Sequence, residues 1–343
     1  MPQYCHSGES RNPGGYWMPD QVRHDGVRIF SCQVNISHSS IMSKLISVII
    51  PSGRADSVFN TVEGLFNQKI DRSEYEIIVV TSEPDKLQRL KAAGACIIAV
   101  ERLYAPGKMR NIGVDAASGE FLYFIDDDCI PSTDWLEVMQ KSLKQEINIG
   151  AVGCRVVALE VSFWNRCADY ALFSSYQYDN TIFCNLGSAA IAVRREAFES
   201  VKGFDEILLA SEDWDFSMKL VENGWRSLFE PRIEVKHDHR RDTLNKIIRM
   251  GYQSGLRSEL IIQVRHLKNI SWLARFSVRL QNPLLYSLLI VPYGLAVTMF
   301  QLWELRGTEP RLIYFVPFIL LTRIAYQIGV WISICNKKRF SWR

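Results

Sequence analysis

The sequence predicts an α/β domain with a doubly wound, mostly parallel sheet, followed by a C-terminal transmembrane helical hairpin. From Leu45 onward, short apolar runs rich in β-branched residues alternate with segments of helical period, the order typical of a parallel α/β sheet. These runs are apolar throughout, as expected of strands that are covered on both faces. The C-terminal end of the chain holds two apolar segments that are each long enough to cross a membrane.

The elements of the α/β domain follow from apolar spacing. The predicted strands are 45–51 (LISVIIP), 76–81 (EIIVVT), 96–100 (CIIAV) and 120–125 (EFLYFI). Helices with one apolar face are predicted from Val58, from Lys108 to a stop at Gly119, and after Ser132. Because doubly wound sheets bind ligands outside the carboxyl ends of their strands, the residues after Ile125 are the first place to look for a site.

Composition excludes several classes of protein. The chain has 343 residues and a net charge of +3, which gives no reason to expect a nucleic-acid partner. Its eight cysteines are scattered without a CxxC pair, which fits neither a zinc site nor a disulfide-dense secreted domain. We therefore expect reduced cysteines in a cytosolic compartment.

Residues 1–43 differ in composition from the rest of the chain. They are rich in Gly, Ser, Pro, His and Arg and show neither a signal-peptide apolar run nor a sustained period. We interpret them as disordered or as a non-native leader, with Met42 as an alternative start. The α/β domain is then expected over 44–240, and basic amphipathic juxtamembrane helices over 241–282.

The two apolar segments predict the membrane anchor. Residues 283–303 carry no charge, and 312–335 carry only Arg323. Basic residues flank the pair on both sides, including those of the tail 336–343, so the positive-inside rule puts both ends and the catalytic domain in the cytoplasm, at the inner (plasma) membrane. The short turn 304–311 is then expected on the far side of the membrane. A pair of buried core helices is the alternative.

Three acidic residues follow the strand 120–125. Asp126 and Asp128 are expected to point the same way, so their carboxylates can converge on one hard cation such as Mg²⁺ or Mn²⁺. That cation would neutralise the charge of a nucleotide diphosphate as it leaves. Solvated acids in a turn are the simpler alternative.

A second acidic pair, Glu212 and Asp213, stands at the predicted start of a helix that Gly224 ends. Acids are favoured at a helix N-terminus for electrostatic reasons alone. The functional alternative is a general base that accepts the proton of an attacking hydroxyl. One acidic cluster for a metal and another for the base is a sensible division of roles.

These motifs together resemble family 2 glycosyltransferases with the GT-A fold. The resemblance covers roughly 45–239 and rests on the ordered set SVIIP, GKMRNIGVDAASGEFLYFIDDDCIPSTDWL, GSAAIAVRREAFESVKGFDE, SEDWDFSMKLVENGW and VKHDH. It implies a nucleotide-sugar donor and transfer to an acceptor hydroxyl with inversion. The acceptor class would be a glycan or a lipid-linked glycan, and membrane lipids would be further partners.

The resemblance also implies roles for individual residues. Asp213 would be the catalytic base, with Glu212 beside it, and Asp126, Asp128 and His237 would hold the metal, with His239 as a substitute for His237. The remaining residues fall into two sets by ligand. Those implied to contact the donor are Pro51, Ser52, Arg54, Arg110, Asn111, Asp126 and Asp127. Those implied to line the acceptor side are Gly187, Ser188 and Trp214.

Departures from the family pattern limit what the resemblance implies about the nucleotide base and about processivity. Thr81, Ser82 and Glu83 replace the usual base-contacting Asp after the second strand, so the nucleotide base stays open. The QxxRW element of processive synthases is absent, which favours a non-processive enzyme. A nucleotidyltransferase of similar fold and a catalytically inactive membrane scaffold remain as alternatives. The intact acidic clusters count against the scaffold.

Overall fold

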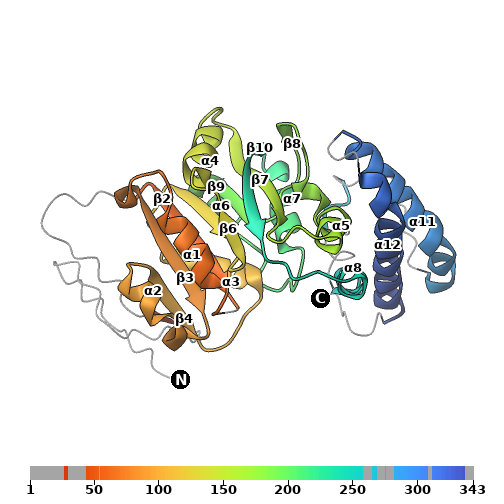
Figure 1. The fold of residues 1–343 in the computed structure, drawn as a ribbon, viewed down its shortest axis with the longest axis horizontal. Coiled ribbons are helices and arrows are strands. Elements are labelled where there is room, and N and C mark those ends of the chain that lie inside the picture. The colour runs from red at the N-terminus through yellow and green to blue at the C-terminus, as the bar shows by residue number, and fades with distance from the viewer. Residues whose placement is uncertain are drawn as a thin grey trace, which may run out of the picture.

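The computed structural model describes residues 27–29, 44–53, 55–257, 265–268, 275, 282–307 and 311–336. A sheet covered by helices makes up most of the molecule, and a helical hairpin lies at one end of it (Figure 1). Arg54, most of the predicted juxtamembrane stretch after Arg257 and the tail from 337 onward lie outside the described residues.

Ten strands form one sheet in the described part of the chain, in the order β1-β4-β3-β2-β5-β9-β7-β10-β6, with β8 paired to β10. Their bounds are β1 Val27–Ile29, β2 Ile46–Ser52, β3 Tyr75–Thr81, β4 Cys96–Val100, β5 Phe121–Ile125, β6 Cys129–Pro131, β7 Ile149–Ala158, β8 Ile182–Phe183, β9 Ala190–Arg194 and β10 Arg226–His237.

The sheet is mixed, but most of its strands are parallel to one another. Strands β4, β3, β2 and β5 are parallel neighbours, and β7 and β10 form a second parallel pair. Strand β9 enters antiparallel between the two groups. Strand β3, which follows β2 in the chain, lies on one side of β2, and β5 lies on the other side. The direction in which successive strands are added to the sheet therefore reverses between β2 and β5. Ligands bind at such a switch point in doubly wound sheets.

Helices cover both faces of the sheet, which confirms the doubly wound prediction. One apolar cluster joins the sheet to α1 (Val58–Phe66) and α4 (Trp135–Leu143). The other joins the opposite face to α3 (Pro106–Asp115), α6 (Arg195–Ser200) and α7 (Glu212–Glu222). Shorter elements are η1 (Arg72–Glu74), η2 (Pro84–Leu87), α2 (Gln88–Ala92) and η3 (Ser174–Tyr176).

Two predicted boundaries need correction. Helix α3 begins earlier than predicted, at Pro106, because proline is favoured at the first helical position, and it ends at Asp115. Gly119 therefore does not stop the helix. It packs on the first strand of the domain, where a Cβ would lie 2.6 Å from the backbone nitrogen of Ser47.

Three residues of the segment interpreted as disordered or as a non-native leader are part of the sheet. Val27–Ile29 form β1, which pairs antiparallel with Ile98–Val100 of β4. The rest of the leader up to residue 43 lies outside the described residues. The short strand extends the sheet at the edge opposite to β6.

The predicted apolar hairpin is present as α11 (Pro283–Glu304) and α12 (Leu312–Cys335). Both helices are long and apolar enough to cross a membrane. Only 17% of the most apolar stretch of α11 is buried, against 33% for α12. A helix of the soluble core would be mostly buried, so α11 does not fit the core-helix alternative.

The turn of the hairpin lies against the domain that contains the sheet. Leu305 and Leu312, at the two sides of the turn, are buried in one apolar cluster with Cys167 and Tyr170 of α5 (Phe163–Leu172). The turn is therefore in contact with the catalytic domain instead of remote from it. The sequence did not predict this contact, since length and apolarity do not show what each end of a helix packs against.

Helix α8 (Leu244–Arg257) packs against α12 at very short range. A Cβ added to Gly255 would lie 2.1 Å from the carbonyl oxygen of Tyr326, and one added to Gly329 would lie 2.3 Å from the carbonyl oxygen of Tyr252. Gly251 lies one turn before Gly255 and faces Thr322. Small residues at this spacing let two helix backbones approach closely.

We expect Gly255→Val to destabilise the full-length protein by about 1–3 kcal/mol, because the added carbons overlap the backbone of α12. Thermal unfolding in detergent measures the effect. Gly307→Ala is the matched control, since nothing lies within 4 Å of a Cβ at that position. Equal melting temperatures for both variants would contradict the close packing of α8 on α12.

Candidate active site at the carboxyl edge of the sheet

The ends of several strands bring polar residues together at one edge of the sheet. Strands β2, β5 and β10 are parallel in direction, and their carboxyl ends lead to Gly53, Asp126 and His237. The antiparallel β9 begins at the same edge, where the backbone nitrogen of Asp126 donates to the carbonyl oxygen of Ala189, 3.0 Å away. The site therefore lies at the switch point between β2 and β5.

Asp127 joins the loops that follow β2 and β5. Its Oδ2 accepts a hydrogen bond from the backbone nitrogen of Gly53 at 2.9 Å. Its carbonyl oxygen accepts another from the Thr61 hydroxyl of α1 at 3.0 Å. Asp127 is buried, so its carboxylate holds the backbone of the two loops in place.

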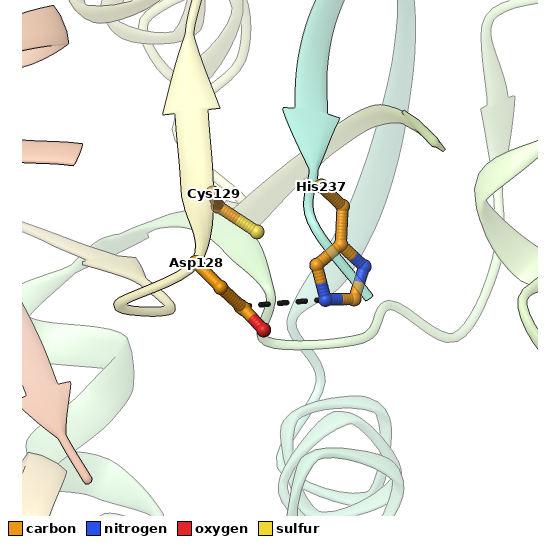
Figure 2. Close-up of side chains that lie close together, drawn as sticks. All are labelled: Asp128, Cys129 and His237. Atoms are coloured by element: carbon orange, nitrogen blue, oxygen red, sulfur yellow. Dashed lines mark ion pairs between the residues drawn. The ribbon is translucent and has the colours of Figure 1, made fainter. Parts of the chain in front are cut away.

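Asp128 faces His237 (Figure 2). Asp128 Oδ1 lies 3.3 Å from His237 Nε2, and both residues are buried. The two come together because β6 pairs antiparallel with β10, with Cys129 opposite His237. The carboxylate, the imidazole and the Cys129 thiol lie within 4.8 Å of one another.

Two of these three groups suit Mg²⁺ or Mn²⁺. Carboxylates are the usual protein ligands of such ions and imidazole binds transition-metal ions, whereas thiolates favour softer metals. Burial raises the pKa of Cys129 well above its ordinary value, so its sulfur stays protonated. Asp128 and His237 therefore fit a divalent cation, and Cys129 is a neighbour of that site.

Arg110 joins the two acidic clusters. From α3 it donates to Glu212 Oε1 at 2.7 Å and to Asp126 Oδ1 at 2.8 Å, with only 3% of its side chain exposed. Its guanidinium also lies over the Phe204 ring. Burial alone would lower the pKa of Arg110, but Asp126 and Glu212 raise it, so the charge persists at any physiological pH.

Asp126 is only partly neutralised by this arrangement. Burial raises its pKa, Arg110 opposes the rise, and the negative charge of Asp128 adds to it. When the pKa of a carboxyl group is raised in this way, a further positive charge nearby stabilises its ionised form. Asp126 faces Arg110 while Asp128 faces His237, so the two predicted metal ligands are neighbours with different partners.

Asp213 is held by backbone donors at the start of α7. Its Oδ2 accepts from the backbone nitrogen of Ser188 at 3.3 Å, and its Oδ1 accepts from that of Trp214 at 2.8 Å. Burial and the adjacent Glu212 raise the pKa of Asp213 to about 6, against the opposing effect of Arg110. A carboxyl with such a pKa can both take and release a proton near neutral pH.

Position 187 has to be glycine because a side chain there would overlap the buried Tyr176. A Cβ at this position would lie 1.7 Å from the hydroxyl oxygen of Tyr176. That hydroxyl oxygen in turn accepts a hydrogen bond from the backbone nitrogen of Ala189, 3.3 Å away. Gly187 and Ser188 therefore pass directly over Tyr176 before Ser188 reaches Asp213.

The remaining predicted residues lie around this centre. Ser52 is buried at the end of β2 beside Pro51. Asn111 does not face the acidic groups through its amide, which bonds to the backbone nitrogen and carbonyl of Phe204 and to Glu206. Its role as a donor contact stays a prediction. Trp214 is half-buried beside Asp213.

His239, predicted as a substitute for His237, has other contacts. Its Nε2 lies 3.5 Å from Asp169 of α5, and its Nδ1 accepts from the backbone nitrogen of Arg241. Its ring stacks on Phe173 and meets the His237 ring at 5.4 Å. His239 therefore supports the position of His237.

Sequence reasoning missed two residues of this site. Tyr176 fixes the backbone beneath Gly187, and Phe204 packs against Arg110 while anchoring Asn111. Neither is part of a sequence pattern with a chemical signature. Phe204 stood inside the quoted segment VKGFDE, so its aromatic character beside two acids was the only available signal.

The sheet order, the acidic edge and the helices on both faces define a nucleotide-diphospho-sugar transferase fold of the GT-A type. Residues 47–202 match the family model described as Glycosyl transferase family 2.

Curated relatives include glycosyltransferases of bacteria and archaea. A pre-mycofactocin glycosyltransferase of Mycobacterium tuberculosis is 34% identical over 170 residues, which are 47% of this chain and 35% of that protein. The chain thus spans about a third of the length of this relative. A dolichyl N-acetyl-α-D-glucosaminyl phosphate 3-β-D-2,3-diacetamido-2,3-dideoxy-β-D-glucuronosyltransferase of Methanococcus voltae is 23% identical over 80% of this chain and 92% of its own length.

A solved structure supports the fold over most of the chain. A mannosyltransferase from Pyrobaculum calidifontis, solved with GDP-Man and Mn²⁺, superposes with a TM-score of 0.57 at 17% identity. The match covers 87% of this chain and 89% of the other. At this identity the likeness concerns the fold alone.

We expect Arg110→Met to lower the free energy of unfolding by about 3–5 kcal/mol, because it leaves two carboxylates without their buried partner. Urea unfolding of the full chain measures the change. Lys141→Met, which breaks the exposed pair with Glu137, is the control and should cost about 0–1 kcal/mol. Similar losses in both variants would show that Arg110 does not hold the site together.

Proposed function

We propose that this chain is a glycosyltransferase that moves a sugar from a nucleotide-diphosphate donor to an acceptor hydroxyl. The observation that carries the proposal is the pair of acidic groups on either side of Arg110. Asp213, with its raised pKa, stands on one side, and Asp126 with Asp128 and His237 stands on the other. This reaction needs a proton acceptor for the attacking hydroxyl and a cation to neutralise the leaving diphosphate, and the two candidate groups lie beside each other here.

The cation side suits the donor diphosphate. Asp128 and His237 would hold Mg²⁺ or Mn²⁺, with Asp126 beside them, and the ion would supply charge neutralisation for the departing nucleotide. The mannosyltransferase of the same fold was solved with Mn²⁺, which supports this assignment. Ser52 and the Gly53 backbone lie at the adjoining end of β2, and the donor's nucleoside portion is assigned to this side of the site.

Asp213 supplies the proton chemistry. Its carboxylate takes the proton from the acceptor hydroxyl while that oxygen forms a bond to the anomeric carbon. The bond from that carbon to the diphosphate breaks in the same displacement, so the anomeric configuration inverts. Glu212 keeps Arg110 in place and raises the proton affinity of Asp213. Positioning supplies much of the acceleration in such a displacement.

We further propose that the enzyme is non-processive and works at the inner (plasma) membrane, with the catalytic domain 44–240 on the cytoplasmic side. The apolar hairpin supports membrane association, and nucleotide sugars are cytoplasmic metabolites. A membrane-held enzyme favours a glycan acceptor of the cell envelope or one carried on a lipid. Basic residues around the hairpin suit anionic headgroups.

We expect Asp213→Asn to lower sugar transfer by about 10²–10⁴-fold, because the amide cannot accept the proton. Purified protein is assayed with a panel of nucleotide sugars and membrane extracts, with Asp134→Asn, at the half-buried residue that precedes α4, as control. In the parent, transfer should fall about tenfold per pH unit below pH 6, as protons occupy the base. Nucleotide transfer instead of sugar transfer would indicate a nucleotidyltransferase, and inert protein a scaffold.

We expect Asp128→Asn and His237→Gln to weaken Mn²⁺ binding by about 10–100-fold, since each removes one candidate ligand. Electron paramagnetic resonance of free Mn²⁺ during a titration measures the affinity without any assay of transfer. Cys129→Ala is the control and should bind Mn²⁺ like the parent, because its thiol is protonated. A loss in the cysteine variant alone would contradict the assignment.

A further inference from the structure

The hairpin lies along the side of the catalytic domain. Helix α12 is sandwiched between α11 on its outer side and α5 and α8 on its inner side (Figure 1). At the turn end, the Phe315 ring stacks on Tyr170, and the Phe318 ring meets Trp164, both of α5. Further along, Thr322 and Gly329 meet the glycines of α8.

This contact covers most of the length that a membrane would occupy. From Leu312 to Gly329, α12 rises about 26 Å, whereas the hydrocarbon core of a bilayer is about 30 Å thick. A hairpin that crossed the bilayer with its turn on the far side would therefore carry α5 and α8 into the hydrocarbon with it.

The helices α5 and α8 are not built for that environment. Lys246 and Arg249 of α8 are exposed, and Asp169 of α5 reaches His239 beside the candidate cation site. A charged side chain at the bilayer centre is strongly unfavourable unless it is paired or reaches water. Immersing α5 would also immerse the edge of the sheet that binds the donor.

The two sides of the hairpin have opposite character. Its inner side carries polar contacts: Arg323 donates to Gln301 Oε1 at 2.7 Å, and Gln301 donates to the carbonyl oxygen of Tyr170. The outer side of α11 is an exposed apolar stripe along the whole helix. It consists of Leu284, Leu288, Val291, Leu295, Met299 and Trp303, and Leu284 is 80% exposed.

We propose that the hairpin enters the bilayer sideways, with the stripe of α11 in the hydrocarbon of one leaflet and the turn on the same side as the catalytic domain. The partner of this surface is lipid, because the stripe is apolar along the whole of α11 and the sequence on both sides of the hairpin carries basic residues that suit headgroups. The inference rests on the membrane association proposed above. It does not depend on the transfer reaction.

Accessibility of the turn tests this arrangement. Gly307→Cys is introduced into the full chain with the other exposed cysteines replaced, and a membrane-impermeant maleimide is applied to either face of sealed vesicles. Gly307 is exposed and has open space around a Cβ, so the variant should fold. Ile147→Cys, on an exposed side chain of the catalytic domain, reports the domain's side. We expect both cysteines to be labelled from the same face. Labelling of Gly307→Cys from the opposite face, or from neither, would overturn the proposal.

A second measurement identifies what covers the stripe. A fluorophore on Leu288→Cys should be quenched by nitroxide-bearing lipids, whereas one on Ile147→Cys should not. Quenching with both cysteines on one face supports sideways insertion. Disulfide-linked dimers through Leu288→Cys without quenching would instead assign the stripe to a second copy of the chain and contradict the lipid contact. Neither readout measures sugar transfer, so failure here leaves the proposed enzyme function untouched.

Discussion

The buried Arg110 is the interaction on which the site depends. It lies on α3, and its two hydrogen bonds reach Asp126 after β5 and Glu212 at the start of α7. These segments come from opposite halves of the domain, and without a shared cation their carboxylates would repel one another. Since Asp213 follows Glu212 directly, the same guanidinium also sets where the proposed base stands relative to the cation side.

Two further residues hold the backbone around Arg110 in place. Asp127 ties the loop after β2 to the loop after β5, and Tyr176 supports the backbone that reaches Asp213 through Ser188. The metal side is supported in the same manner, because Phe173 and His239 pack around His237. The reactive groups thus stand on strand ends and one helix start, and their positions are maintained by residues without a chemical role of their own.

Sequence alone predicted the strands 76–81 and 96–100 within one residue, and it singled out Asp126–Asp128 after a strand and Asp213 at the start of a helix. Apolar runs and acidic triplets are local patterns, so they can be read in order along the chain. The partners of these acids could not be predicted from local patterns, because the Arg110–Glu212 contact joins residues 102 positions apart. The same limit explains the hairpin: its helices were predicted, but the burial of Leu305 against α5 depends on tertiary packing alone.

Helix α5 is covered on one side by the hairpin and supports His239 on the other. A soluble fragment made by deleting everything after Asn282 would remove the Phe318 and Phe315 rings that contact Trp164 and Tyr170, and the apolar patch left on α5 would promote aggregation. Expression strategies that trim the chain to its sheet would thereby disturb the support of His237. Detergent or nanodiscs around the intact protein preserve both surfaces of this helix.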